Sequence, residues 1–322
     1  MFGAVPYKTK QFFFVLIKLS IVVGAFYFIY HKLTTNHELD FQVFGQFLSK
    51  NDAFTAKNIV FLVILSIFNW FFEILKWQHL VSFFKKISFL NSLEQSLGSL
   101  TASLFTPNRI GEYGVKAMYY SRSDTKKILA LNLLGNFMQM ATTVLFGFLG
   151  CYLYFSKYSL DIEYYKVFRI GVVIFIIVIF PIIGLKKSNF SIRGISMSTA
   201  KIFYTSIPWY IYFKGLLFSI IRYLIFSFQF YFLLKMFGLT LDYVDAMTII
   251  TTMYLLASII PTLAIFDVVL KGSVAVYLFS VIKISNLSIL SVVTLMWILN
   301  VVLPSLLGAM YVLKFKLPKQ TV

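Results

Sequence analysis

The sequence predicts an all-α, polytopic membrane protein built from transmembrane helices. Of its 322 residues, 59% are hydrophobic and only 13% are charged, whereas soluble domains carry about 25% charged residues. Apolar runs of about 17–25 residues recur along the chain, which is the length that a helix needs to cross a bilayer. A membrane β-barrel would instead show short segments of alternating polarity. The whole chain, residues 1–322, is therefore expected to be one transmembrane domain.

Uninterrupted apolar runs are expected to form about six full spans. The first run is too long for the apolar core of a signal peptide, and it ends in aromatic rather than small residues, so it is interpreted as an uncleaved span. In chain order, the runs are Phe12–Tyr30, Ile59–Trp77, Ile128–Phe155, Val167–Leu185, Gly215–Met236 and Ser288–Leu313.

Two further apolar stretches are interrupted by proline. Asn91–Tyr120 is broken at Pro107, and Tyr243–Ile282 is broken at Pro261. Proline has no amide proton to donate, and it disfavours helical backbone at the residue before it. Each stretch is therefore expected to form a broken helical hairpin that re-enters the membrane and returns to the side from which it came.

The two broken stretches are related by an offset of 154–155 residues, and the flanking spans follow nearly the same offset. The chain thus divides into a first half, residues 8–155, and a second half, residues 156–316. Each half has three full spans, so the second half enters from the opposite face, as in an inverted repeat. In transporters, paired breaks of this kind mark the binding site. The matched residues are Pro107 with Pro261, Glu112 with Asp267, and Lys116 with Lys271.

The net charge of +17 does not indicate a nucleic-acid partner, because the basic residues sort by side of the membrane. With a cytoplasmic N-terminus and two hairpins that return, the basic residues on the cytoplasmic side outnumber those outside by about two to one, as the positive-inside rule requires. Both termini are then cytoplasmic. The basic inner surface would also contact anionic membrane lipids.

Charges at the first break need a polar environment. A charged side chain at the centre of a lipid-facing helix costs about 2.5–3.5 kcal/mol, so Arg109, Glu112 and Lys116 are expected to line a wet cavity, pack against protein or lie at the interface. The spacing of Glu112 and Lys116 allows an ion pair on one helix face. Because a helix would restart near Ile110, its free amides beside Arg109 predict an anion site.

The second break repeats the acid–base spacing with Asp267 and Lys271. Other polar positions leave two interpretations open. A serine face before the first break either packs helices tightly or lines a cavity, and three further charges within spans either snorkel to the surface or face the bundle. The serines are Ser92, Ser96, Ser99 and Ser103, and the charges are Lys18, Glu73 and Arg222.

No signal for catalysis or for a cofactor is found. The single cysteine, Cys151, lies in an apolar run, and the three histidines show no metal-ligand spacing. Phosphate-binding loops, nucleophile elbows and dinucleotide-binding glycine motifs are absent. We therefore expect no catalytic residue, no metal and no cofactor.

The segment LFTPNRIGEYGVKAMYY resembles the first signature of the lysylphosphatidylglycerol synthase transmembrane-region family, also called flippase-like. That signature is a proline, an arginine, a hydrophobic residue, glycine and glutamate, followed by a basic residue. EILKWQHLVSF resembles the basic-aromatic segment upstream, and IIPTLAIFDVVLKGSVAVYLF resembles the second signature, with Asp267 where the family usually has glutamate. The resemblance assigns Pro107, Arg109, Gly111 and Glu112 to the first motif, and Pro261, Asp267 and Lys271 to the second.

The resemblance implies a membrane protein that moves lipids or lipid-linked headgroups, here without the soluble synthase domain found in some members. We expect a multi-pass protein of the bacterial inner (cytoplasmic) membrane that binds an anionic phospholipid or lipid-linked phosphate in a midplane cavity. The alternatives are an integral-membrane transferase that uses a polyprenyl-phosphate donor, and a non-transporting scaffold. The expected binding residues are Pro107, Arg109, Gly111, Glu112, Lys116, Pro261, Asp267 and Lys271.

Overall fold

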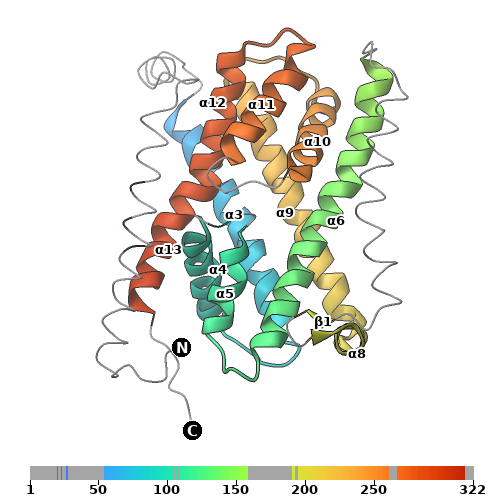
Figure 1. Cartoon of the computed structure of the whole chain (residues 1–322). Helices are drawn as coiled ribbons and strands as arrows, with labels where there is room; N and C mark the ends of the chain where they lie inside the picture. The colour runs from blue at the N-terminus through green and yellow to red at the C-terminus, as the bar shows by residue number, and fades with distance from the viewer. Residues whose placement is uncertain are drawn as a thin grey trace.

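The described part of the chain is a bundle of helices with one two-stranded antiparallel ribbon (Figure 1). The computed structural model describes residues 54–158 except 105, 107 and 108, residues 191–315 except 193, 194 and 261–266, and the single positions 20, 23 and 27. Its elements are α3 (Ala56–Val81), α4 (Phe89–Ser103), α5 (Ile110–Met118), α6 (Thr125–Lys157), β1 (Ser191–Ile192), β2 (Ile195–Ser196), α8 (Met197–Ser206), α9 (Trp209–Met236), α10 (Tyr243–Ile259), α11 (Asp267–Ser280), α12 (Asn286–Trp297), the π-helical turn η1 (Ile298–Val302) and α13 (Leu303–Lys314).

Four helices in the described residues are long and apolar enough to cross a membrane. They are α3, α6, α9 and the continuous run α12–η1–α13, with 26, 33, 28 and 29 residues. These helices coincide with four of the predicted spans. The other two, Phe12–Tyr30 and Val167–Leu185, lie outside the described residues apart from single positions in the first.

Large apolar side chains cover the outer surface of these long helices. Ile67 on α3 and Phe137 and Phe148 on α6 are all more than 60% exposed. Contiguous exposed apolar surface of this kind is rare on soluble monomers, whereas it matches the hydrocarbon of a bilayer. The protein is a multi-pass integral membrane protein.

The described helices on either side of each break are shorter. With a rise of about 1.5 Å per residue, the 15 residues of α4 and the 9 of α5 span about 22 and 14 Å. The 17 residues of α10 and the 14 of α11 span about 26 and 21 Å. None reaches the roughly 30 Å of a hydrocarbon core. Each predicted break therefore falls between two helices too short to cross alone, although Pro107 and Pro261 lie outside the described residues.

The order of a long helix, two short helices and another long helix occurs twice in the described chain. The short pair α4 and α5 lies in the lower half of the view, and the short pair α10 and α11 lies in the upper half (Figure 1). This arrangement supports an inverted relation between the halves, which stays a prediction here, as does re-entry of the short pairs.

Glycines allow close packing between the two halves. A Cβ atom on Gly150 of α6 would lie 2.0 Å from the hydroxyl of Thr251 on α10. A Cβ atom on Gly308 of α13 would lie 2.1 Å from the carbonyl of Leu97 on α4. In each half, the short helix before the break therefore packs backbone to backbone against a long helix of the other half, as small residues permit in membranes.

The last membrane helix changes geometry at η1 because of Pro304. Proline has no amide proton, so Pro304 cannot donate to the carbonyl of Asn300, four residues earlier. That carbonyl instead accepts a hydrogen bond of 3.0 Å from the indole of Trp70 on α3. The side chain of Asn300 accepts from Asn69 at 2.8 Å and donates to Gln229 at 2.8 Å. The irregular turn thereby brings a polar side chain to the centre of the bundle, against α3 and α9.

Candidate functional site

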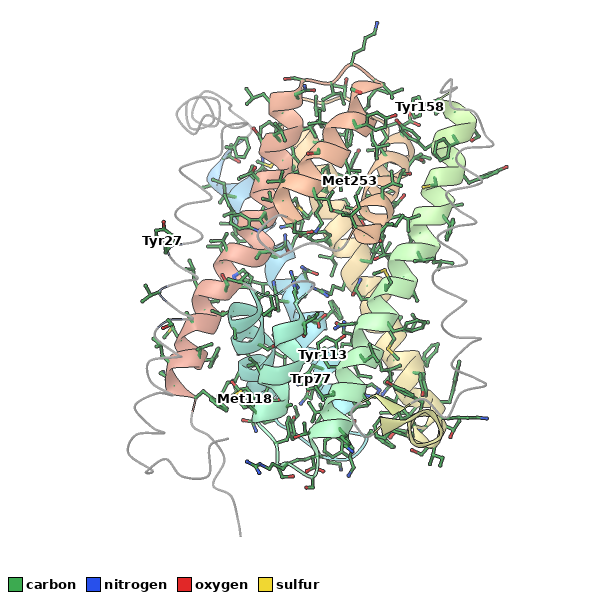
Figure 2. The ribbon with its side chains drawn as sticks, viewed as in Figure 1. Tyr27, Trp77, Tyr113, Met118, Tyr158 and Met253 are labelled. Atoms are coloured by element: carbon green, nitrogen blue, oxygen red, sulfur yellow. The ribbon has the colours of Figure 1, made fainter. Side chains whose placement is uncertain are left out.

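Two adjoining cavities lie inside the bundle. The first cavity, about 290 Å³, is enclosed mainly by α3, α4, α5, α6 and α9. The second cavity, about 330 Å³, is enclosed mainly by α9, α10, α11 and α12. Figure 2 shows Tyr113 of the first cavity in the lower half of the view and Met253 of the second in the upper half. Residues common to both walls are Arg109, Gln139, Thr143, Arg222 and Ser258.

Arg109 occupies the boundary between the two cavities, directly before the first turn of α5. Its backbone is left-handed, with φ 55° and ψ 32°, which costs an L-residue with a side chain about 1–2 kcal/mol. Within the described residues, no hydrogen bond or ion pair engages its guanidinium group. A strained residue in a cavity wall, whose charge has no partner in the described part of the chain, is a candidate for ligand binding.

Thr106 and Gly111 fix the start of α5. The Thr106 hydroxyl donates to the carbonyl of Ser103 at 2.8 Å and accepts from the Gly111 amide at 2.9 Å. The amide of Glu112 donates to the carbonyl of Arg109 at 2.9 Å. The helix does restart at Ile110 as predicted, but these two amides already have acceptors. Any anion at this position would therefore meet the side chain of Arg109 rather than free amides of Gly111 and Glu112.

The predicted pair in the first break forms. Lys116 donates to Glu112 at 2.6 Å and to the side-chain oxygen of Asn132 at 2.9 Å. Its ammonium group also lies 4.2 Å from the ring centre of Trp77, within cation–π range. The Lys116 side chain is only 2% exposed. Three contacts thus hold a buried cation in the first cavity while leaving part of the Glu112 carboxylate at its wall.

The predicted pair in the second break also forms. Lys271 donates to Asp267 at 2.7 Å, and both side chains are roughly a quarter exposed, at 29% and 26%. Both residues line the second cavity together with Arg109. Arg109 therefore shares one cavity wall with Asp267 and Lys271, which lie more than 150 residues further along the sequence.

Arg222 on α9 is a site residue whose role the sequence left open. It donates to Glu73 at 2.6 Å, to Asn69 at 3.0 Å and to Gln139 at 3.4 Å. Its side chain is 19% exposed and lines both cavities. The snorkelling interpretation of Arg222 and Glu73 is therefore wrong, because both face the bundle. The sequence held one signal for this pair, since Arg222 and Glu73 are opposite charges that lie inside separate apolar spans.

Lys76 is one of the basic residues that the positive-inside count places on the cytoplasmic surface, but the structure buries it. Its side chain is 3% exposed and donates to Glu73 at 2.8 Å. Glu73 thus serves two cations, Lys76 on its own helix and Arg222 on α9. The sequence interpretation missed this because Lys76 sits at the predicted membrane boundary, where a lysine is ordinarily solvated.

The serine face of α4 serves mainly for packing. Ser92 donates to the carbonyl of Ile74 on α3 at 2.7 Å, and Ser99 and Ser103 donate to carbonyls of their own helix. The hydroxyl of Ser96 is buried and has no partner in the described residues, and Ser96 lines the first cavity. Three serines of this face therefore serve in helix packing, and Ser96 lines a cavity.

The charged side chains of the two walls do not balance. Three carboxylates lie there, Glu73, Glu112 and Asp267. Each carboxylate is in contact with at least one cation. The cations in the walls are Arg109, Lys116, Arg222 and Lys271. Arg109 is therefore the cation without a counter-charge among the described residues, and it lies where the two cavities meet.

The family named Lysylphosphatidylglycerol synthase TM region matches residues 15–308, which is most of the chain. The chain belongs to this family. No curated protein and no solved structure matches it. The match confirms the resemblance that the two proline-broken motifs indicate, and it includes every residue of the two cavities.

Proposed function

We propose that this member of the lysylphosphatidylglycerol synthase TM-region family binds the phosphate of an anionic phospholipid or lipid-linked phosphate and carries it across the membrane. The observation that carries the proposal is the position of Arg109. A guanidinium group at the boundary of the two cavities, with no partner among the described residues, matches a phosphate, which it can bind through two parallel hydrogen bonds.

Arg109 is partly buried and has no counter-charge among the described residues, which favours a charged ligand beside it. An isolated cation in a medium of low dielectric constant is costly unless a counter-charge joins it. The carboxylates of the walls contact Lys116, Lys271, Lys76 and Arg222. A ligand phosphate is then the counter-charge for Arg109. The glutamate and aspartate of the two breaks act by holding their lysines in place.

The arrangement of the cavities supports movement of the ligand. The first cavity lies mainly among the elements of the first half, and the second cavity lies mainly among those of the second half. Arg109 and Arg222 lie in both walls. If the halves are inverted relative to one another, each cavity would open toward one face of the membrane. We propose this inverted arrangement, with re-entrant breaks and both termini in the cytoplasm of a bacterial cell.

Reconstitution into liposomes tests the proposal. The probe is phosphatidylglycerol with a fluorescent acyl chain, whose exposure in the outer leaflet is measured by chemical quenching. The protein should increase movement between the leaflets relative to protein-free liposomes, and Arg109→Ala should abolish most of this increase. Lys86→Ala, at an exposed basic position, should not.

Lipid extracted from the same liposomes separates the rival functions. A transporter leaves phosphatidylglycerol chemically unchanged, whereas a transferase supplied with a polyprenyl-phosphate donor produces a modified lipid. Movement that equals the protein-free control would contradict the transport proposal. A donor-dependent product would replace it with the transferase.

A further inference from the structure

Arg222 lines both cavities and shares its counter-charge with a second cation. Its Nη1 atom donates to the Oε2 atom of Glu73 at 2.6 Å, and Lys76 donates to the same oxygen at 2.8 Å. The Nη2 atom of Arg222 makes no hydrogen bond within the described residues, and it is not sealed from the cavities. Arg222 therefore keeps a donor for a ligand at the boundary where Arg109 also lies.

The charged groups around the two cavities carry an excess of positive charge. They are the charged residues of the two walls together with Lys76, which lies behind Glu73. The cations are Lys76, Arg109, Lys116, Arg222 and Lys271, and the carboxylates are Glu73, Glu112 and Asp267. Two positive charges of this set therefore have no counter-charge of their own among the described residues.

The apolar parts of the undescribed sequence contain no carboxylate that could balance this excess. The predicted spans Phe12–Tyr30 and Val167–Leu185 have no aspartate or glutamate, and neither do residues 261–266 in the second break. The acids among the undescribed residues all lie outside the apolar runs, and they are Glu38, Asp40, Asp52, Asp161 and Glu163. Uncompensated charge inside an apolar bundle is costly, so a ligand with two negative charges is favoured.

We infer that the site selects a lipid that ends in a phosphomonoester over a phosphodiester lipid such as phosphatidylglycerol. This inference rests on the proposed function, and it narrows the ligand. A phosphomonoester carries close to two negative charges and three acceptor oxygens. Its oxygens can accept from Arg109 and from the Nη2 atom of Arg222 together, and its charge balances the excess. A phosphodiester carries one negative charge and leaves one positive charge uncompensated.

Two short-chain lipids that differ only at the phosphate test this selectivity. They are dihexanoyl phosphatidate, a phosphomonoester, and its phosphate methyl ester, a phosphodiester. Binding of each to the full-length protein in detergent is measured by titration calorimetry at about pH 8, where the phosphomonoester is doubly charged. Hydrogen bonds to charged groups typically change affinity by about tenfold or more, so the phosphomonoester should bind about tenfold more tightly. Equal affinities would overturn the inference.

The pH dependence of this preference is a second readout. The second proton of a phosphomonoester dissociates near about pH 6, whereas the methyl ester stays singly charged. The preference should therefore fall from about tenfold at about pH 8 to about twofold at about pH 5. Titration of the carboxylates of the protein affects both lipids and largely cancels in the ratio. A ratio that stays constant with pH would contradict selection by charge.

Lys76→Met tests the charge count without changing either cavity wall. Lys76 lies in neither wall, and its side chain is 3% exposed. In the variant, Glu73 serves Arg222 alone and one positive charge of the excess is removed. The preference at about pH 8 should then fall to about threefold or less. An unchanged preference would show that Lys76 adds no charge to the site, and the inference would be wrong. If the variant does not fold, the pH dependence of the unmodified protein decides.

Lys127→Met is the matched control for that change. Lys127 also lies three residues from the acid that it contacts, Asp124, but its side chain is 49% exposed and outside both cavities. Its removal should leave the preference for the phosphomonoester unchanged. A fall as large as that for Lys76→Met would show that the preference follows the overall charge of the protein, and the site assignment would be wrong.

Inorganic phosphate and Arg109→Ala separate the ligand sources and the two proposals. Inorganic phosphate at the concentration of the lipid should not displace dihexanoyl phosphatidate, because acyl chains add apolar contact. If it does, the site takes free phosphate and the lipid assignment is wrong. Arg109→Ala should weaken binding of both lipids. If it weakens neither, the proposed phosphate site fails. If it weakens both, while the unmodified protein binds the two lipids equally, only the selectivity for a phosphomonoester fails.

Discussion

Arg222 on α9 donates a hydrogen bond of 2.6 Å to the carboxylate of Glu73 on α3, inside the membrane bundle. Glu73 also pairs with Lys76, while Arg222 bonds Asn69, which in turn bonds Asn300 on the last helix. One carboxylate therefore contacts two cations, and the network connects the two halves. Arg222 of this network shares both cavity walls with Arg109, the wall cation that has no partner among the described residues.

Replacing Glu73 with glutamine should destabilise the protein strongly. Glutamine keeps the shape of the side chain but leaves Arg222 and Lys76 without a counter-charge. Breaking a buried pair in this way typically costs about 3–5 kcal/mol. Chemical or thermal unfolding in detergent, followed by circular dichroism, measures the loss.

Asp124→Asn is the matched control for that change. Asp124 pairs with Lys127 at 3.4 Å on the exposed surface, where the lysine side chain is 49% exposed. Exposed pairs contribute about 0–1 kcal/mol. A loss for Glu73→Gln no greater than for Asp124→Asn would show that the Glu73 network does not stabilise the bundle.

Arg109→Gly should separate the binding role of Arg109 from any structural role. Glycine adopts left-handed backbone without the steric cost that Arg109 bears at φ 55°. The free energy of unfolding should therefore rise by up to about 1 kcal/mol, while lipid binding falls. Lys283→Gly is the control, since Lys283 is exposed, has φ 57° and lies outside both cavities. It should raise stability and leave binding intact. If Arg109→Gly lowered the stability strongly and Lys283→Gly did not, the role of Arg109 would be structural.

Two glycines of α5 should respond in opposite directions to alanine. A Cβ atom on Gly111 would lie 2.9 Å from the Thr106 methyl group and 3.3 Å from the backbone of Ser103. Overpacking of this kind costs about 1–3 kcal/mol. A Cβ atom on Gly114 meets nothing within 4 Å, so Gly114→Ala should stabilise the helix by about 0.5–1 kcal/mol. Unfolding curves of the two variants compare them directly. Equal effects would mean that the Thr106–Gly111 contact does not hold the start of α5.

The sequence predicted the elements that apolar length and proline determine. It placed four described spans, both breaks, the restart of helix at Ile110 and the pairs Glu112–Lys116 and Asp267–Lys271. These features depend on local spacing, either along one helix or along one apolar run. The roles of Pro107 and Pro261 at the breaks stay predictions, as does the inverted orientation of the two halves.

The contacts between helices could not be predicted in the same way. Whether Arg222 faces lipid or Glu73 depends on how α9 is rotated about its axis relative to α3. Because α9 is apolar on every face, its sequence does not specify that rotation. The same holds for Lys76, whose burial follows from its position beside Glu73. The binding of Trp70 to the Asn300 carbonyl also required the packed structure, although Pro304 signalled that this carbonyl would lack its usual partner.

Cysteine labelling should place the two short helix pairs on opposite faces of the membrane. In a background with Cys151→Ala, single cysteines at Lys86 and Arg122, which flank α4 and α5, should react only from the cytoplasm. Cysteines at Thr240 and Ser285, which flank α10 and α11, should react only from outside. All four positions are exposed. If Lys86 and Arg122 label from opposite faces, the first break crosses the membrane and the inverted arrangement is wrong.

Binding of short-chain phosphatidylglycerol to purified protein tests the central claim most directly, which is that Arg109 holds a lipid phosphate. A charge-assisted bidentate contact contributes about 1.5–3 kcal/mol, so Arg109→Ala should weaken the equilibrium affinity by about tenfold to a hundredfold. Arg109→Lys should recover part of this loss, because a lysine keeps the charge but not the paired donors. Lys86→Ala should leave the affinity unchanged. Equal affinities for Arg109→Ala, Lys86→Ala and the unmodified protein would contradict the account.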